Sequence, residues 1–371
     1  MASKALFAPF ALLLNLCDER GGHADYDADP EPSLDAGVEL DCATPDAAAP
    51  RCEGPPGLYR DDHCQVLAEG VRSYRPRYPF YSDGAGKERF VYLPPGTKID
   101  ATDPDVWVFP KGTRLYKTFA LEGKTLETRI IEKVGDGAGS DQWTFVAYAW
   151  TQEQTGVEPE PVDADAGRMN WLDTPHDIPT LGECHRCHER AGQDAINGFS
   201  AIQLNHEFTD LSLADLVAEG LIDTPDGEAL IAEARVPGDD LDRTALGTLH
   251  TNCGICHGGT RPPQGLGLRL AVGDEAVEDT AAWATAIDEP LRNWTGRTLP
   301  VDVGDGFYET RILPGKPEKS GVIGRMSVRG RGEQMPPVAV ETIDVEGRAK
   351  IAAWISRLKP GAKPPKEDDG R

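Results

Sequence analysis

Two short segments of the chain repeat one pattern of cysteine and histidine. The sequence reads CHRCH at residues 184–188 and CGICH at residues 253–257. Each segment is Cys-x-x-Cys-His, the pattern by which c-type haem is attached to a protein. Two cysteines three positions apart on one turn present both thiols to one edge of a porphyrin, and the following histidine is placed to bind the iron. The pattern therefore predicts two covalently bound haem c groups.

The two motifs predict the attachment residues and the proximal iron ligands. The expected thioether bonds involve four cysteines: Cys184, Cys187, Cys253 and Cys256. The expected proximal ligands are His188 and His257. A zinc site built from both cysteine pairs would leave these histidines unexplained. A thioredoxin-like dithiol would be expected as a single motif in a βαβ unit.

The sixth ligand of each iron follows less directly from the sequence. Met335 lies in QMPP at residues 334–337, where the prolines restrict the loop and a thioether ligand would raise the reduction potential. We expect Met335 to bind the second iron, with Met326 as the nearest competitor. For the first iron the candidates remain open: His250, His176, His206, Met169 or an open sixth site.

The N-terminus has the character of an export signal over residues 1–17. Lys4 precedes an apolar run at residues 5–16 that is too short to span a bilayer. Cys17 follows directly, so we expect lipidation there, although Leu16 occupies a position where a small residue is usual. The alternative is an ordinary signal peptide cut slightly later. The predicted location is the periplasm or outer cell envelope, with a membrane tether through lipidated Cys17.

Composition divides the remaining chain into five segments. Residues 18–50 are rich in Asp, Ala, Pro and Gly and are expected to form a disordered acidic linker. Residues 51–161 are expected to be β-rich, and residues 162–240 and 241–360 to form one cytochrome c haem unit each. Residues 361–371 are expected to be a disordered tail. The predicted fold class is multidomain: an antiparallel β-sandwich-like domain followed by a mainly α-helical di-haem cytochrome c region.

Strands are expected where β-branched and aromatic residues lie between turn signals. They are residues 88–93, 106–109, 113–119, 126–133 and 143–150. In residues 113–119 the side chains alternate, with Leu115, Lys117 and Phe119 on one face and Arg114, Tyr116 and Thr118 on the other, which predicts a half-buried strand. Helices are expected over residues 211–217, 241–250 and 351–358, the last with Asp344 as its cap and Pro360 beyond it.

Three cysteines outside the haem motifs lie near the start of the β-rich segment. In an oxidising compartment two of them should pair. We expect Cys52 to pair with Cys64, because this bond would fix the start of the folded region, and Cys42 is then left over. Further along, Ser82, Asp83 and Lys87 lie in a glycine-containing turn, which we interpret as a loop held by aspartate hydrogen bonds rather than as a binding site.

The chain resembles a family of bacterial di-haem c-type cytochromes with an N-terminal β domain. Apart from the two haem motifs, the resemblance is carried by YPFYSDG at residues 78–84, FVYLPPGT at 90–97, FPKGT at 109–113, GF at 198–199, QLN at 203–205, LHTN at 249–252, PGKPEKS at 314–320 and MPP at 335–337. It covers about residues 74–358. The resemblance supports Met335 as a ligand and places His250 before the second motif, whereas His206 is not part of the pattern.

Single-electron transfer is the function we expect from two attached haems. One alternative is a di-haem peroxidase-like oxidoreductase whose first haem has an open site. Another is a binding module whose β domain docks a partner while the haems relay electrons. The formal net charge of −24 disfavours nucleic acid and anionic lipid surfaces and is compatible with a basic redox partner protein.

Overall fold

The computed structural model describes residues 51–189, 192–194, 196–258, 262–292, 301–302, 307–330, 332–338 and 340–361. Every structural statement below concerns these residues. The predicted signal segment with Cys17, the linker with Cys42 and the tail beyond residue 361 lie outside them.

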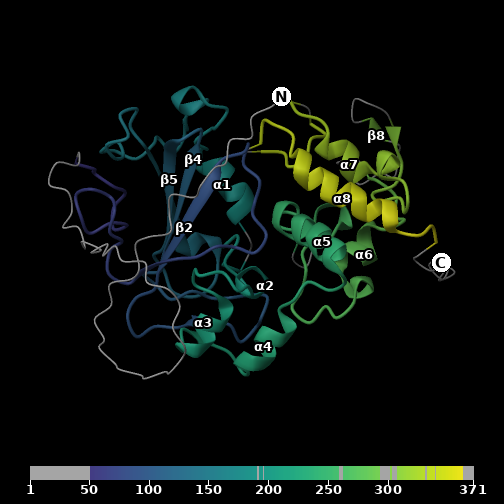
Figure 1. Ribbon diagram of the computed structural model, residues 1–371, viewed down its shortest axis with the longest axis horizontal. Coiled ribbons are helices and arrows are strands. Elements are labelled where there is room, and N and C mark those ends of the chain that lie inside the picture. Colours follow the sequence, from purple (N-terminus) through teal and green to yellow (C-terminus); the bar gives the residue numbers. More distant parts are fainter. Residues whose placement is uncertain are drawn as a thin grey trace, which may run out of the picture. The chain divides into compact units, whose positions relative to one another are not determined.

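An antiparallel sheet of five strands forms the N-terminal part of the described chain (Figure 1). In order across the sheet the strands are β1 (Val71–Ser73), β2 (Gly86–Tyr92), β4 (Arg114–Leu121), β5 (Lys124–Lys133) and β6 (Trp143–Ala149). Two small pairs lie apart from it: β3 (Ile99–Asp100) with β7 (Ile222–Asp223), and β8 (Val301–Asp302) with β9 (Phe307–Tyr308).

Four of the five predicted strands are confirmed, and the strand predicted at residues 106–109 is wrong. Val108 makes only a single bridge, to Asp100. Trp107 and Phe109 are buried instead, in edge-to-face contact with the ring of Phe199. The aromatic residues that suggested a strand therefore fill the core rather than extend the sheet.

Both faces of the sheet are covered, so the half-buried strand predicted at residues 113–119 is wrong. On β4, Leu115 is buried on one face and Tyr116 on the other. We call the face of Leu115 the inner face. The outer face packs Tyr116 against Leu58, from the segment that precedes the sheet. The predicted β domain is thus confirmed as an antiparallel sheet but not as a sandwich, because a loop segment takes the place of a second sheet.

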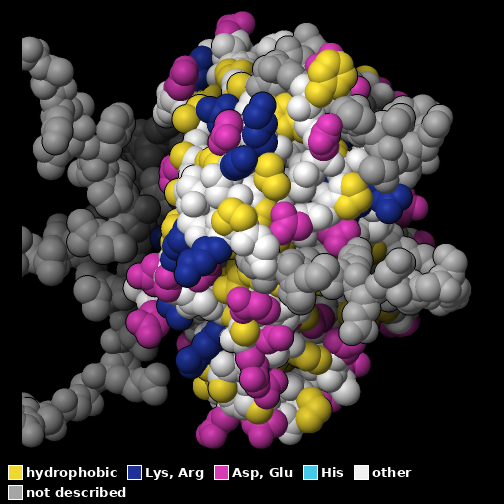
Figure 2. All heavy atoms as spheres, turned by 90° about the vertical axis from the view of Figure 1, so that its right-hand side faces the viewer, with side chains coloured by type: hydrophobic (Ala, Val, Ile, Leu, Met, Phe, Trp, Pro, Cys, Tyr) yellow, Lys and Arg dark blue, Asp and Glu magenta, His cyan; other side chains and the backbone are white. Residues whose placement is uncertain are grey.

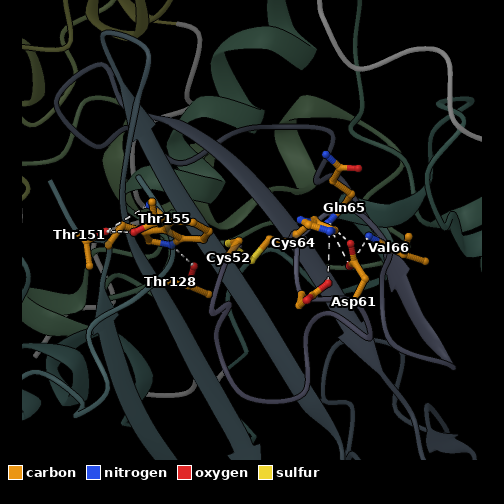
Figure 3. Close-up of a disulfide and its surroundings, with 11 residues drawn as sticks. Cys52, Asp61, Cys64, Gln65, Val66, Thr128, Thr151 and Thr155 are labelled. Atoms are coloured by element: carbon orange, nitrogen blue, oxygen red, sulfur yellow. Dashed lines mark hydrogen bonds and ion pairs between the residues drawn. A yellow bond between two sulfur atoms is a disulfide. The ribbon is translucent and has the colours of Figure 1, made fainter. Parts of the chain in front are cut away.

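A disulfide between Cys52 and Cys64 fixes the covering segment, as predicted (Figure 3). Cys52 packs against Trp150 at the end of β6. Asp61 lies inside the disulfide loop, and its carboxylate accepts hydrogen bonds from the backbone N–H groups of Gln65 (3.1 Å) and Val66 (2.8 Å), which directly follow the loop. The disulfide therefore holds a short ordered loop against the sheet.

The helices lie mainly after the sheet. They are α1 (Leu181–His188), α2 (Ala201–Leu204), α3 (Leu213–Ala218), α4 (Gly227–Glu233), α5 (Asp240–Asn252), α6 (Ala281–Ala286), α7 (Gly321–Met326) and α8 (Val345–Arg357). Short 3-10 turns occur at Ser140–Gln142, Trp171–Asp173, Pro263–Gly265, Val277–Asp279 and Pro317–Lys319. All three predicted helices are present, and Asp344 caps α8 by accepting from the N–H of Gly347 (2.8 Å).

One apolar core joins the sheet to the helices. It runs from Val91 and Leu115 on the inner face to Leu249 in α5 and Trp354 in α8. In Figure 1, α1 lies beside the strands while α5 and α8 pack against each other. The helices are short and separated by loops, so the fold is mixed rather than mainly helical after the sheet. None of the described helices is long and apolar enough to cross a membrane.

Candidate functional site

The whole first motif lies on helix α1. Thr180 caps this helix by accepting from the N–H of Glu183, whose carboxylate in turn accepts from the N–H of Thr180. The helix lies against β6, and the ring of Phe145 on that strand sits 5.4 Å from the ring of His188. The cap and this contact fix the direction in which the motif residues face.

The second motif forms a turn that continues helix α5. The N–H of Cys253 donates to Leu249, and the N–H of His257 donates to the carbonyl of Cys253 (2.8 Å). Gly254 is required in this turn, because a Cβ there would lie 2.9 Å from Cα of Arg269. The second motif is therefore held between the end of α5 and the chain around residue 269.

The two motifs meet in space. Sγ of Cys256 lies 3.8 Å from the carbonyl oxygen of Arg186, inside the first motif. A hydrogen bond with Cys256, together with burial, raises the pKa of Cys187. Burial also raises the pKa of Cys184, and raises that of Cys253 to about 12. All four motif cysteines thus belong to one site.

A cavity lies between the inner face of the sheet and the two motifs. Its motif side is formed by Cys184, Cys187, His188, Gly254 and Ile255. Its sheet side includes the apolar side chains of Leu115, Ile131 and Phe145. Four cations also border it: Arg89, Lys117, Arg129 and Arg269. The cavity thus has apolar walls, three cations on its sheet side and Arg269 beside the second motif. Its edge near the first motif carries thiols and the carboxylate of Glu183.

These residues suit a covalently attached haem better than zinc. No three Cys, His, Asp or Glu side chains of the described chain converge as a metal cluster would require. Nδ1 of His257 is buried without a hydrogen-bond partner among the described residues, which is costly unless a ligand compensates for it. Burial lowers the pKa of His257, which favours the neutral ring that binds metals.

No family model, curated protein or solved structure matches the chain. The chemistry of the site therefore rests on its own residues and geometry.

The two main candidates for sixth ligand of the first iron are both hydrogen-bonded. Nε2 of His176 lies 2.7 Å from the carboxylate of Glu127, and both side chains are buried. His250 borders the cavity, and its Nδ1 accepts from the N–H of Leu270 (3.0 Å). A metal-bound histidine usually donates a hydrogen bond from its second ring nitrogen. In His250 the ring nitrogen Nδ1 accepts a hydrogen bond instead of donating one, and this does not favour ligation of an iron by the ring.

The methionine candidates occupy different environments. Met169 is exposed, and Met326 is buried in the apolar core. The N–H of Met335 donates to the carbonyl of Arg325 (3.0 Å), and the charge of Arg325 contributes, after burial, to the lowered pKa of His257. The bond between Met335 and Arg325 ties the Met335 loop to α7. His206 accepts from the N–H of Phe208 and stacks on its ring.

The segments that carried the family resemblance connect the sheet to the second motif. The side chain of Gln203 accepts from the N–H of Tyr78 (3.0 Å) and donates to the hydroxyl of Thr251 (2.6 Å). The N–H of Tyr81 donates to Asn252 (2.8 Å), the residue before Cys253. These bonds tie α5, and with it the second motif, to the chain that leads into β2.

The loop interpretation of Asp83 is confirmed, with a long-range partner. Its carboxylate accepts from the N–H groups of Glu341 (2.9 Å) and Thr342 (2.7 Å), just before α8. Lys87 donates to two nearby backbone carbonyls.

The sequence analysis did not identify the cations of the cavity. The pattern that could have revealed them is on β4, where Lys117 shares the inner face with the buried Leu115 and Phe119.

Proposed function

We propose that this chain is an exported di-haem c-type cytochrome that transfers single electrons. The observation that carries the proposal is the meeting of the two Cys-x-x-Cys-His motifs, with Sγ of Cys256 at 3.8 Å from the carbonyl of Arg186. Electron carriers require their redox groups to be close together and shielded from water. Two motifs that meet at one half-buried site, beside an apolar wall, would meet both requirements.

The residues of the site have distinct roles under this proposal. Each haem, when bound, supplies an iron that cycles between the ferric and ferrous states. The four motif cysteines hold the haems covalently, and His188 and His257 bind the irons. Met335 is the sixth ligand of the second iron and raises its reduction potential. The apolar wall formed by Leu115, Ile131 and Phe145 excludes water and so limits reorganisation when the charge changes.

Two observations support an exported protein with a protein redox partner. The Cys52–Cys64 disulfide is typical of an oxidising compartment. Figure 2 shows acidic side chains spread over one face, with basic ones in small groups between them. With a formal net charge of −24, a basic partner would be attracted and nucleic acid repelled. Anchoring through lipidated Cys17 remains part of the proposal.

A di-haem peroxidase-like oxidoreductase is the second candidate function. It is favoured by the hydrogen bonds of the first iron's ligand candidates: His176 is bound to Glu127, and Nδ1 of His250 accepts from Leu270. An iron without a sixth protein ligand would admit peroxide. Reaction of the reduced protein with peroxide separates this function from electron transfer, since only an open haem gives saturable turnover.

Extraction of the haem tests the main proposal. Protein exported from a host with haem-attachment machinery should keep two haems per chain after treatment with acidified acetone, because thioether bonds resist this solvent. The paired variants Cys184→Ala/Cys187→Ala and Cys253→Ala/Cys256→Ala should each keep one haem. The variant Cys52→Ser/Cys64→Ser, outside the motifs, should keep two. Loss of all colour from the unsubstituted protein would contradict the proposal.

A further inference from the structure

Three cations form a row across the middle of the sheet, on its inner face. Arg89 of β2 is directly opposite Lys117 of β4, and Lys117 is directly opposite Arg129 of β5. Like charges directly opposite each other on neighbouring strands destabilise a sheet. The row also borders the cavity, where screening by water is weak. A protein with a formal net charge of −24 thus places three basic side chains side by side at its candidate site.

The row lacks enough negative charge of its own. Arg129 is paired with the buried carboxylate of Glu127 (2.5 Å), which is shared with His176. Arg89 is 7% exposed, and in the described part of the chain its guanidinium has no hydrogen bond or ion pair. The ammonium of Lys117 lies over the rings of Phe80 (5.5 Å) and Phe119 (5.0 Å) and forms no ion pair or hydrogen bond with the described residues. Burial, together with the charges of Arg89 and Arg129, lowers its pKa well below the usual value. Two cations therefore lack an anion.

The cavity beside the row suits a ligand with an apolar body and two anionic groups. The row lies on the side of the first motif, because Arg129 on β5 is directly opposite Ala147 on β6, the strand against which α1 packs. Cys184 and Cys187 of α1 border the same cavity as the row. A haem bound through its vinyl groups carries two carboxylates elsewhere on its rim. Their number matches the two cations that lack an anion.

We propose that Arg89 and Lys117 bind the two carboxylates of the haem attached at Cys184 and Cys187, with Arg129 held beside them by Glu127. The inference rests on the proposed function and adds an anion subsite to it. Charge-assisted bonds to carboxylates would convert a repulsive row into a paired one. The paired cations would also tune the reduction potential of the first haem alone, since charge near an iron shifts the balance between its two oxidation states.

The variants Arg89→Gln and Lys117→Gln test the subsite in the haem-bearing protein. Both should keep two haems and lower the potential of one haem, because a carboxylate without its cation favours the ferric state. The conservative variant Arg89→Lys keeps the positive charge and should therefore have the reduction potential of the unsubstituted protein. Arg114→Gln is the matched control, since Arg114 lies on the same strand as Lys117, on the outer face and paired with Glu132. It should leave both potentials unchanged.

The sign of the stability change gives a second, independent readout. If the cations are paired, Lys117→Gln leaves a buried carboxylate without its partner and lowers the free energy of unfolding in urea. If they are unpaired, the same change removes like-charge repulsion and raises it. A rise in stability with unchanged potentials would overturn the inference while leaving the proposed function intact. Absence of haem from the unsubstituted protein would instead refute the proposed function.

A free anion is the other source of the same chemistry. Inorganic phosphate added to the haem-bearing protein should not change its spectrum if the haem carboxylates occupy the row. Saturable phosphate binding that Lys117→Gln abolishes would mean that the row is a site for a free anion, and would overturn the inference.

Discussion

The thiol of Cys256 lies 3.8 Å from the carbonyl oxygen of Arg186, although the two residues are 70 positions apart. Each belongs to a different Cys-x-x-Cys-His motif. The first motif is positioned by α1 against β6, and the second is tied to the chain before β2 through the Tyr81–Asn252 bond. The sheet is thus the common support that brings the two motifs together, which explains how a β domain would serve a di-haem protein.

Replacing Met335 tests the proposed ligand of the second iron. Met335→Ala should leave two haems attached, abolish the far-red absorption of Met–iron ligation in the ferric protein, and lower the potential of one haem, since thioether ligation favours the ferrous state. Absorption spectra and a redox titration measure both effects. Met326→Leu, a similar-sized change at a buried core position, should alter neither. A normal spectrum in Met335→Ala would assign Met335 a packing role.

Carbon monoxide tests the candidates for the first iron. A carrier with both irons six-coordinate should bind little carbon monoxide when fully reduced. His176→Ala should not create a new binding site, because Nε2 of His176 is bonded to Glu127. Its main effect should be a loss of stability of about 1–3 kcal/mol, from a buried carboxylate that loses a partner. New stoichiometric binding in His176→Ala, and not in His250→Ala, would identify His176 as the ligand.

A buried ion pair is expected to be essential for the folded state. Lys133 and Asp194 are 2.6 Å apart, and both side chains are fully buried. Asp194 also accepts from the N–H groups of Phe109 and Gly139. Asp194→Asn should lower the free energy of unfolding by about 3–5 kcal/mol, because it leaves a buried ammonium without its counterion. Glu346→Gln, which breaks an exposed i,i+4 pair with Lys350, should cost at most about 0.5 kcal/mol in the same urea titration.

The disulfide should contribute stability without affecting haem attachment. It closes a loop with a sequence separation of 12 residues. The variant Cys52→Ser/Cys64→Ser should therefore lose about 3 kcal/mol, mainly through greater freedom of the unfolded chain. Urea unfolding under non-reducing conditions measures the loss. An equal stability of variant and parent would mean that the covering segment is held by its packing on Trp150 and the outer face alone.

Asp105 should make stability depend on pH. Burial raises its pKa to about 6, although its carboxylate accepts from the N–H of Val272 (3.1 Å). The folded state therefore binds this proton more tightly than the unfolded state. The resulting stability is complete below the unfolded pKa of 3.8 and is lost as the pH rises through about 6.

Asp105→Asn should remove this dependence and raise stability at neutral pH by at most about 3 kcal/mol. Urea unfolding across the acidic range measures it. The exposed Glu318, changed to Gln, is the control and should leave the pH profile as it is. If the pH dependence of the free energy of unfolding is unchanged in Asp105→Asn, another group controls stability in the acidic range.

Local patterns in the sequence determined much of this protein. The two Cys-x-x-Cys-His motifs, four of the five strands, three helices and the Asp344 cap depend on residues within one or two turns of each other, where propensity and spacing decide the outcome. The pairing of Cys52 with Cys64 was also predictable, since this bond fixes the start of the folded region.

Only the tertiary structure decided how these pieces meet. Residues 106–109 became core because Phe199 lies over them, and β4 is buried on both faces because a loop covers its outer side. The contact between Cys256 and Arg186 and the row of Arg89, Lys117 and Arg129 depend on strand register and on how α1 and α5 pack. Register and packing are set by the burial of apolar surface from distant parts of the chain, which no local pattern contains.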